Sequence, residues 1–520
     1  MEAIPKTREY CPMFIREDEQ MSVSANKVVP PQTNSVLTGL EPAVFFGFFE
    51  ELSAIPRGSY NEKQVSDHIA NFARARGLEV YQDEIWNLLI KKPGTPGYEN
   101  APTLILHGHT DIVCESDEGV EHDFESVGIK LRLDGDFIHG TGTTLGADNT
   151  VGVAFAMSLL ASDDTPHPPL EVVLTVQEEV GKGGAQHFDG TKLTGKRLLD
   201  MNWHDPKSLF AGCAGDISAH FRIPLQWSER PNGQEAARLR VSGLSSGHSE
   251  FDIHLERANA IVLLGRLLRL AIKEGDVSIA KLEGGVNRYV IPGEAEALIS
   301  FDRSVLGALR SKIEAEAAAI AAEYSTSDPN LKITFEEDSG LFFSVFSENV
   351  ATGAVNAMCL LPNGVQSRSL IVDNLVESSN TVALISNDQE RIEITSTIPS
   401  AVSSRRYNIV DRIRQLSEVI GLGASVETFA DCPEWPYNPK SRMLAAGRAA
   451  YEREFGEQPH VEVSHSSLEL GLFRKKVPDI DMLSIGPEAF DVHTTRERLN
   501  HTTVEATWRL LKALLSELRT

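Results

Sequence analysis

The chain has 520 residues, of which 41% are hydrophobic and 24% charged, and its formal net charge is −25. The length is sufficient for two or three domains with a large core, and the composition is ordinary for a soluble globular protein. The excess of acidic side chains argues against nucleic acid and against anionic membrane surfaces as partners.

The N-terminal region is expected to begin as a disordered tail over residues 1–35, which mix Pro, Ser, Asn and charge without periodicity. Order is expected from about Leu40, with helices over residues 42–52 and 62–76 and a short strand over 78–81. Strands and helices then alternate to about residue 215. This pattern is typical of an α/β domain with a mainly parallel central sheet.

The pattern of hydrophobic and polar residues changes after residue 215. Strands with alternating polarity, such as residues 237–242, are separated by predicted helices over 258–274 and 306–324. The final stretch returns to α/β texture, with a helix over 441–455, a strand over 480–485 and a helix from Thr503. We therefore expect a discontinuous α/β domain made of residues 36–215 and 429–520, with an α+β domain, residues 216–428, inserted into it.

The five cysteines are Cys11, Cys114, Cys213, Cys359 and Cys432, an odd and scattered set without any CxxC pair. Such usage favours a reducing compartment over a disulfide framework. No run approaches the ~18 apolar residues of a membrane span, and no signal peptide is visible. A cytoplasmic location is the expectation.

The most informative stretch is the apolar run Thr103–Leu106, which ends in His107, His109 and Asp111. A short apolar run bounded by turn signals is typical of a strand buried on both faces. In an open parallel sheet, ligand-binding groups lie at the carboxyl ends of the strands. Taken alone, these residues are equally compatible with a structural histidine and a capping aspartate.

Other segments of the α/β part end in the same way, at Asp148, at Glu178 and Glu179, and at His493. Two adjacent glutamates after a strand of Val and Leu are costly unless they are paired or bind a metal. Two histidines with several carboxylates suit zinc, with manganese or cobalt as competitors. Together the segments predict a metal-dependent hydrolase in which one glutamate acts as general base.

The chain resembles the aminoacyl-histidine dipeptidases (Xaa-His dipeptidases, cytosol non-specific dipeptidases, carnosinase-like enzymes) of the co-catalytic zinc metallopeptidase superfamily. The resemblance runs from about residue 40 to the C-terminus. Its most specific motif is GTTLGADN at 142–149; the others are Ile55-Pro56 with Ser59-Tyr60, His109-Thr110-Asp111, Glu178-Glu179, Gly212–Gly215, Gly247-His248-Ser249, Leu468–Phe473 and Ser484–Pro487. It implies two divalent metal ions and a lid and dimerisation role for the inserted domain.

The resemblance also implies a role for each matching residue. The metal ligands would be His109, Asp148 (bridging, with a cis peptide bond to Asn149), Glu179, Asn202 and His493. Asp111 would orient His109, and Glu178 would be the general base. His248 would bind substrate and stabilise the oxyanion, often across a dimer interface, and Glu469 would receive the substrate's free amino group.

Several positions depart from the family pattern. Asn202 stands where the family has an aspartate ligand, and Asp200, His204 or Asp205 could substitute for it. Glu250 and Phe251 replace two glycines, and Tyr289 and Val290 replace Asn and Ala in an Arg-Asn-Ala-Ile-Pro segment. An arginine expected for the substrate carboxylate aligns near Pro399, with Arg405 and Arg406 displaced from it.

The function predicted from this pattern is a metallo-dipeptidase that hydrolyses Xaa-His-like dipeptides as a cytoplasmic homodimer, without nucleic acid or membrane partners. Two alternatives remain at this point. One is an amidohydrolase or deacylase acting on another small N-acyl compound. The other is a catalytically weakened homologue that binds peptides, which Asn202 and the missing arginine would favour.

Overall fold

The apolar run before His109 forms strand β3 (Leu104–His109), which is buried along its whole length. The structure is a computed structural model that describes residues 36–275, 277–338 and 342–519. The predicted tail, residues 1–35, lies outside the described residues. Residues 36–520 group into one compact unit.

Strand β3 lies inside a mixed sheet rather than a mainly parallel one. Its neighbours β6 (Leu170–Thr175) and β7 (Arg197–Asp200) are parallel to it, and β20 (Asp481–Ser484) is parallel to β7. The edge strands β2 (Leu88–Lys92) and β1 (Glu79–Gln82) run antiparallel. The expectation of parallel strands is therefore confirmed around β3 and wrong for β2 and β1, which form an antiparallel hairpin across a short connection, with β2 also antiparallel to β6.

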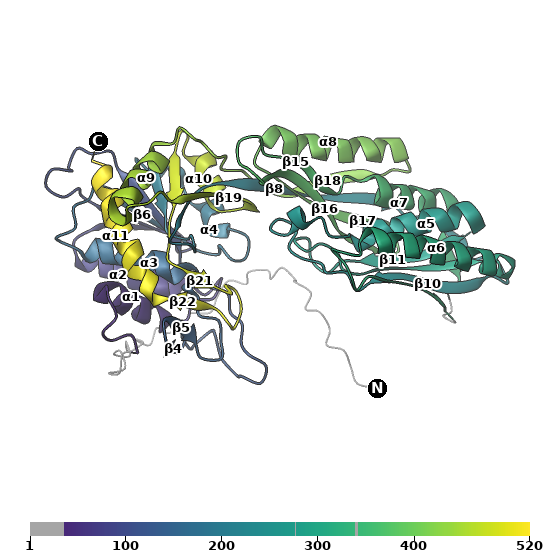
Figure 1. Ribbon diagram of the computed structural model, residues 1–520, viewed down its shortest axis with the longest axis horizontal. Coiled ribbons are helices and arrows are strands. Elements are labelled where there is room, and N and C mark those ends of the chain that lie inside the picture. Colours follow the sequence, from purple (N-terminus) through teal and green to yellow (C-terminus); the bar gives the residue numbers. More distant parts are fainter. Residues whose placement is uncertain (1–35, 276, 339–341, 520) are drawn as a thin grey trace, which may run out of the picture. The chain divides into compact units, whose positions relative to one another are not determined.

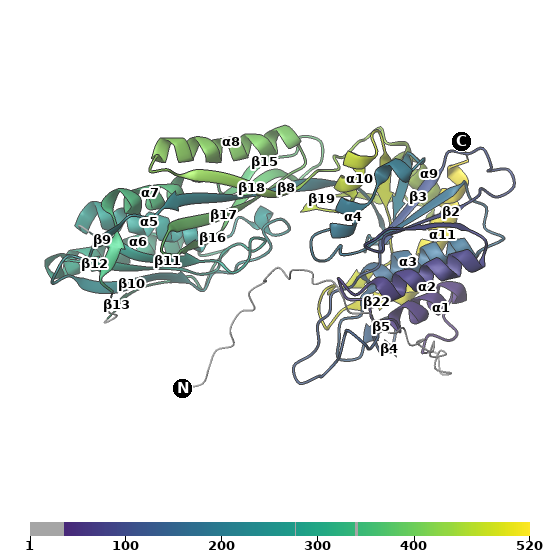
Figure 2. The same ribbon diagram turned by 180° about the vertical axis from the view of Figure 1, so that it is seen from behind.

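Helices cover both faces of this sheet, because alternate residues of its strands contribute to two different cores. Leu104 and Leu106 belong to one core and Ile105 to the other. The first core is completed by α1 (Ala43–Ser53), α2 (Lys63–Ala75), α3 (Ala147–Ala161), α9 (Arg442–Phe455) and α11 (His501–Glu517). The second is completed by α4 (Gly183–His187) and α10 (Leu470–Lys476). Figure 2 shows α1, α2 and α3 beside one another.

A third core lies among residues 217–413 and is built on antiparallel strands. In spatial order these are β17 (Arg391–Ser400), β16 (Val376–Asn387), β11 (Ser278–Gly284), β12 (Ala295–Phe301), β10 (Glu235–Ser242) and β13 (Lys332–Glu337). Helices α5 (Ala260–Gly275), α6 (Leu306–Glu323), α7 (Glu348–Leu360) and α8 (Ser403–Ile420) pack on them (Figure 1). The α+β texture predicted from the sequence is present in this segment.

The two groups of strands share one long strand, β8 (Ser208–Pro224). Its first half pairs with β20 and with β19 (His460–Ser467), and its second half with β17 and β18 (Ser425–Cys432). The domain boundary expected at residue 215 thus falls inside a strand. The division into domains stays a prediction.

Smaller elements complete the described part of the chain. A small antiparallel sheet contains β21 (Ala489–Phe490), β22 (Arg498–Asn500), β5 (Phe137–Gly140) and β4 (Leu131–Asp134). Strands β14 (Ser344–Phe346) and β9 (Trp227–Glu229) pair with each other, and β15 (Gly364–Arg368) pairs with β16. Among the described residues, no helix is long and apolar enough to cross a membrane.

Candidate metal centre

The ionisable residues singled out in the sequence meet at the carboxyl edge of the parallel strands. His109 is the last residue of β3, Glu178 and Glu179 follow β6, and Asn202 follows β7. Asp148 lies in the first turn of α3, and His493 lies in the loop before β22. The burial of these strands on both faces directs their functional groups to this edge.

Four of these side chains form what we refer to as the metal-site cluster: His109, Asp148, Glu179 and His493. His109 Nε2 is 2.8 Å from Asp148 Oδ1, and His493 Nε2 is 3.0 Å from Glu179 Oε2 and 3.5 Å from Asp148 Oδ2. The ligand atoms of His109, Asp148 and Glu179 all lie within 4.8 Å of one another. A single ion could therefore contact donor atoms from several of these side chains at once.

The electrostatics of the cluster are those of buried opposite charges. Burial alone would lower the pKa of His109, but hydrogen bonds to Asp111 and Asp148 raise it well above its usual range. Burial would likewise raise the pKa of Asp148, yet its bonds to His109 and His493 hold it well below the usual value. Asp148 is therefore a carboxylate ready to accept a cation.

The cluster also contains an unsatisfied acceptor. Glu179 Oε1 is buried and has no hydrogen-bond partner among the described residues. Burial and the nearby Asp148 raise the pKa of Glu179. An orphaned buried carboxylate oxygen beside two histidines and a second carboxylate is the donor set that a borderline divalent cation requires, so the residues present fit a metal.

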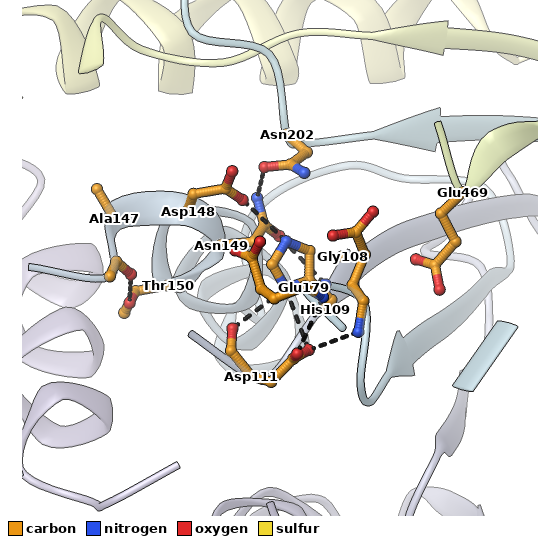
Figure 3. A network of polar contacts seen from close by, with 12 residues as sticks. Gly108, His109, Asp111, Ala147, Asp148, Asn149, Thr150, Glu179, Asn202 and Glu469 are labelled. Atoms are coloured by element: carbon orange, nitrogen blue, oxygen red, sulfur yellow. Dashed lines mark hydrogen bonds and ion pairs between the residues drawn. The ribbon is translucent and has the colours of Figure 1, made fainter. Parts of the chain in front are cut away.

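Asp111 holds the segments of the site together from the side of His109 that faces away from Asp148 (Figure 3). Its carboxylate accepts hydrogen bonds from the backbone N–H groups of Glu178 and Glu179 at 3.0 and 3.1 Å and from Ser59 Oγ at 2.7 Å. Its Oδ1 is also 3.4 Å from His109 Nδ1. These contacts fit the orienting role predicted for Asp111.

The GTTLGADN turn is fixed by a residue that sequence reasoning missed. Both carboxylate oxygens of the buried Glu497 accept backbone N–H groups of the turn, from Leu145, Gly146 and Ala147 at 2.8–2.9 Å and from Asp148 at 3.4 Å. The Asp148–Asn149 peptide bond is cis, as the resemblance implies. Glu497 is about 350 residues from the turn in sequence, and no local pattern marks this contact.

Asn202 reaches the cluster but its oxygen is already used. Its Oδ1 accepts a hydrogen bond of 2.5 Å from Asn149 Nδ2, beside Asp148 (Figure 3). Asn149 is held in turn by the backbone of His109 and Met201. Asn202 therefore lies beside the metal-site cluster, but its side-chain amide is neutral and its oxygen already accepts a hydrogen bond from Asn149.

Two of the three proposed substitutes for Asn202 are occupied elsewhere. Asp200 is buried and bonds His107 Nδ1 at 2.8 Å and Ser484 Oγ at 2.5 Å. Asp205 accepts from the backbone N–H of Lys207. His204 differs, because Asp148 and His493 both act on its charge while burial lowers its pKa. His204 therefore interacts electrostatically with two members of the cluster.

Glu178 and His248 line one cavity of about 330 Å³, together with Glu179 and His493. Burial raises the pKa of Glu178 to about 8, and the charges of His109 and Lys182 oppose that shift. A cation bound in the cluster would lower it again. His248 comes from the segment after β10, and its ring stacks on Tyr289 with centroids 6.1 Å apart.

Glu469 does not line this cavity or the larger one next to it. It is buried, and its Oε2 lies 3.0 Å from His107 Nε2 and 2.9 Å from Thr175 Oγ1. Its Oε1 has no partner among the described residues. Its predicted role as receptor of an amino group stays a prediction.

Comparison with known proteins gives consistent results. A model described as peptidase family M20/M25/M40 matches residues 105–517. A cytosol non-specific dipeptidase of Escherichia coli (strain K12) is 32% identical over 484 residues, which cover 93% of this chain and 99% of that protein.

Solved structures agree with the sequence comparison. The aminoacylhistidine dipeptidase from Vibrio alginolyticus superposes with a TM-score of 0.85 at 31% identity, over 93% of this chain and 98% of that one. The aminopeptidase PepT from Bacillus cereus ATCC 10987 has a TM-score of 0.55 at 15% identity, over 92% of this chain and all of that one. This second likeness shows the fold alone.

Proposed function

From the premise that this chain belongs to peptidase family M20/M25/M40, we propose that it is a metal-dependent dipeptidase acting on Xaa-His-like dipeptides. The observation that carries this is the metal-site cluster, with Glu178 lining the same cavity as Glu179 and His493. The names of the relatives from Escherichia coli and Vibrio alginolyticus support the substrate class.

The cofactor that we propose is a pair of divalent ions, most simply zinc, with manganese or cobalt as alternatives. His109, Asp148 and Asn202 would hold one ion, and Asp148, Glu179 and His493 the other. Bound ions of this kind polarise a carbonyl and lower the pKa of water. The unpartnered Glu179 Oε1 and the shared position of Asp148 support this assignment.

The protein groups would then move protons and stabilise charge. The Glu178 carboxylate takes a proton from the attacking water and delivers it to the leaving amine, as a general base and then a general acid. His248, in the same cavity, donates a hydrogen bond to the oxyanion. Asp111 keeps His109 oriented and fixes the backbone of both glutamates.

We further propose a cytoplasmic homodimer with a catalytic domain of residues 36–215 and 429–520 and a lid and dimerisation domain of residues 216–428. Strongly exposed apolar side chains on the second segment support a contact surface there; they are Val286, Phe343, Leu370, Ile371 and Val419, each more than 70% exposed. Light scattering on the purified protein checks the mass. A monomer at micromolar concentration would contradict the dimer.

A second candidate is a catalytically weakened homologue that binds peptides. Asn202 favours it, because a neutral amide whose oxygen already accepts a hydrogen bond is a poor metal ligand. Against it stands the complete set of Glu178, Glu179 and Asp111, since binding alone requires no general base.

The test is to measure metal content of the purified protein together with hydrolysis of a dipeptide panel that includes β-Ala-His and Gly-His, with added zinc, manganese or cobalt. Removing the metal with a chelator should abolish turnover, and re-adding it should restore turnover. Glu178→Gln should lower kcat by about 10³-fold with metal content unchanged. The exposed Glu118→Gln is the matched control.

Each outcome of this test separates the candidates. Two bound metals without turnover of any dipeptide would favour a deacylase acting on another N-acyl compound. Peptide binding with no metal and no turnover would favour the binding homologue.

A further inference from the structure

A second and larger recess, of about 610 Å³, adjoins the cavity that contains Glu178 and Glu179. The two share a wall made by Gly181, Lys182, Arg288 and Tyr289. A ligand whose reacting carbonyl lies at the metal-site cluster can therefore extend past this wall into the recess. Together the two volumes are in the range of small-molecule binding sites.

Basic side chains outnumber acidic ones around the recess, whereas acidic side chains predominate in the whole chain. Acidic side chains exceed basic ones by 25 over the whole chain. Around the recess, four basic residues (Lys182, Arg288, Lys475 and Lys476) face two acidic ones (Asp216 and Asp431). Among the described residues, no carboxylate oxygen lies within 4.0 Å, the distance of an ion pair, of the charged nitrogens of these four side chains.

Arg288 and Lys476 are held in place by neutral groups. Arg288 donates to Ser218 Oγ at 2.7 Å, and its guanidinium lies 4.1 Å from the centre of the Tyr289 ring. Lys476 Nζ donates to two backbone carbonyls at 2.7 and 2.8 Å. These contacts fix the positions of the charges without neutralising them, so the charges remain available to an anionic ligand.

Lys182 stands at the junction of the two cavities. Its Nζ is 3.4 Å from Ser467 Oγ. Burial would lower the pKa of Lys182, but the charges of Glu178, Asp216 and Glu250 act on it from longer range and raise the pKa above its usual value, so it stays protonated at physiological pH. It offers a charge directly beside the catalytic cavity.

The two acidic residues of the recess do not cancel these cations. Asp431 is engaged by Arg406 at 3.3 Å and by the Tyr407 hydroxyl at 2.7 Å. Asp216 is 2% exposed, and burial raises its pKa against the opposing charges of Lys182 and Arg288. Even with Asp216 charged, the four cations outnumber the acidic groups of the recess. The recess is therefore net positive.

The cavity beside the metal-site cluster carries more carboxylates than the recess. Glu178, Glu179 and Glu250 line it, and Glu250 Oε1 is buried without a partner among the described residues. The other oxygen of Glu250 accepts from Ser466 Oγ at 2.7 Å and from the backbone N–H of Ser467 at 3.2 Å. A zwitterionic dipeptide would place its amine at Glu250, which the metal-site cluster does not use, and its C-terminal residue in the recess.

We propose that this recess binds the C-terminal residue of the substrate and selects an acidic one, so that the preferred substrates are dipeptides ending in Asp or Glu. The α-carboxylate lies at Lys182 and Arg288, and the side-chain carboxylate reaches Lys475 and Lys476. The proposal rests on the proposed dipeptidase function and redirects its specificity from C-terminal histidine. It also supplies a carboxylate site in a chain where Arg405 and Arg406 are paired with Glu377 and Glu434.

The experiment compares kcat/KM of the metal-loaded enzyme for Ala-Glu and Ala-Gln, which have nearly the same shape and differ by one charge. We expect Ala-Glu to be preferred by about tenfold, since a charge-assisted contact distinguishes the two. In Lys475→Gln, an exposed position on α10, this ratio should fall toward one. Lys440→Gln removes an equally exposed lysine outside the recess and should leave the ratio unchanged.

A binding measurement keeps the test independent of turnover. Calorimetry should show glutarate binding at least about fivefold more tightly than its neutral counterpart glutaramate, with the difference lost in Lys475→Gln. A ratio near one for both pairs, or a preference that Lys475→Gln leaves intact, would overturn the proposal. If no dipeptide is hydrolysed, the proposed function fails, and the glutarate measurement alone decides whether the recess is an anion site.

Discussion

At the scale of single residues, the metal centre depends on whether position 202 carries a charge. The oxygen of Asn202 accepts from Asn149 Nδ2, so little of its weak donor capacity remains for a metal. In the proposed arrangement, the metal position of His109 and Asp148 would have one anionic ligand, whereas that of Glu179 and His493 would have two, counting the shared Asp148. Unequal affinities of the two positions follow from this count.

Asn202→Asp should raise the affinity of the weaker position on the order of tenfold, because the new carboxylate can accept from Asn149 with one oxygen and bind a cation with the other. Zinc per protein chain, measured after dialysis against a weak chelator, should rise. Asn330→Asp adds the same charge at a distant exposed position and should have no effect. An unchanged stoichiometry would show that another residue, with His204 the first to examine, already completes the position.

A second residue-scale consequence concerns the buried His465. Burial lowers its pKa to about 3, and its Nε2 is 2.7 Å from Ser379 Oγ. In the unfolded chain a histidine has a pKa near 6.5. As the pH falls from about 6.5 towards 3, the unfolded state therefore binds a proton at this position and the folded state does not. The neutral histidine therefore contributes stability above pH 6.5 that is lost in acid.

His465→Gln should remove this dependence. Between pH 7 and pH 5, the loss in free energy of unfolding should be smaller than in the wild type by about 2 kcal/mol. Denaturant unfolding at the two pH values measures it, and the exposed His254→Gln should follow the wild-type profile. Parallel profiles for His465→Gln and wild type would mean that His465 is protonated in the folded state.

At the scale of elements, the GTTLGADN turn and the start of α3 form one unit that Glu497 closes from the C-terminal part of the chain. The turn supplies Asp148, and Gly108 and Gly152 give space to Asn149. A Cβ at Gly152 would lie 2.2 Å from Asn149 Oδ1, and one at Gly108 would lie 2.5 Å from it. Asp148 is thus positioned by the Glu497 side chain and by the close approach of the Gly108 and Gly152 backbones to Asn149.

Glu497→Ala should leave several buried N–H groups without an acceptor. We expect a loss of about 3 kcal/mol of stability and weaker zinc retention, because Asp148 loses its fixed backbone. Thermal unfolding and metal content after dialysis measure the two effects. The exposed Glu505→Ala on α11 is the control. Full zinc retention with lower stability would show that the Glu497 contacts stabilise the fold without affecting metal binding.

At the scale of the whole molecule, residues 217–413 have a hydrophobic core of their own, and β8 links their sheet to the sheet that contains β3. Two cores joined mainly through one continuous strand should respond separately to local damage. The predicted division into a catalytic and an inserted domain can be tested on that basis.

Leu264→Ala on α5 and Leu511→Ala on α11 each empty a fully buried site, at a cost of about 3 kcal/mol. Hydrogen exchange should accelerate in α5, α7 and β12 for the first variant, and in α3, α9 and α11 for the second. Equal acceleration throughout both regions in either variant would show a single cooperative unit and argue against the division.

The sequence by itself predicted most elements and the four residues that meet in the metal-site cluster, whose role as metal ligands stays a prediction. The helices at 43–53 and 63–75 and strand β3 follow from periodicity and buried apolar runs, and they are present within one or two residues of the prediction. His109, Asp148, Glu179 and His493 were identifiable because polar side chains at the ends of apolar strands are costly without a ligand. The family followed from the motifs around them.

Only the tertiary structure decided which distant groups complete these residues. It shows Glu497 on the turn, Asn149 on the oxygen of Asn202, and Lys182, Arg288 and Lys475 around one recess. It also shows the antiparallel edge of the sheet and the strand shared by both sheets. Such contacts join segments that lie from 53 to 350 residues apart. Local periodicity carries no information about them, because burial and charge at a site are set by every element packed against it.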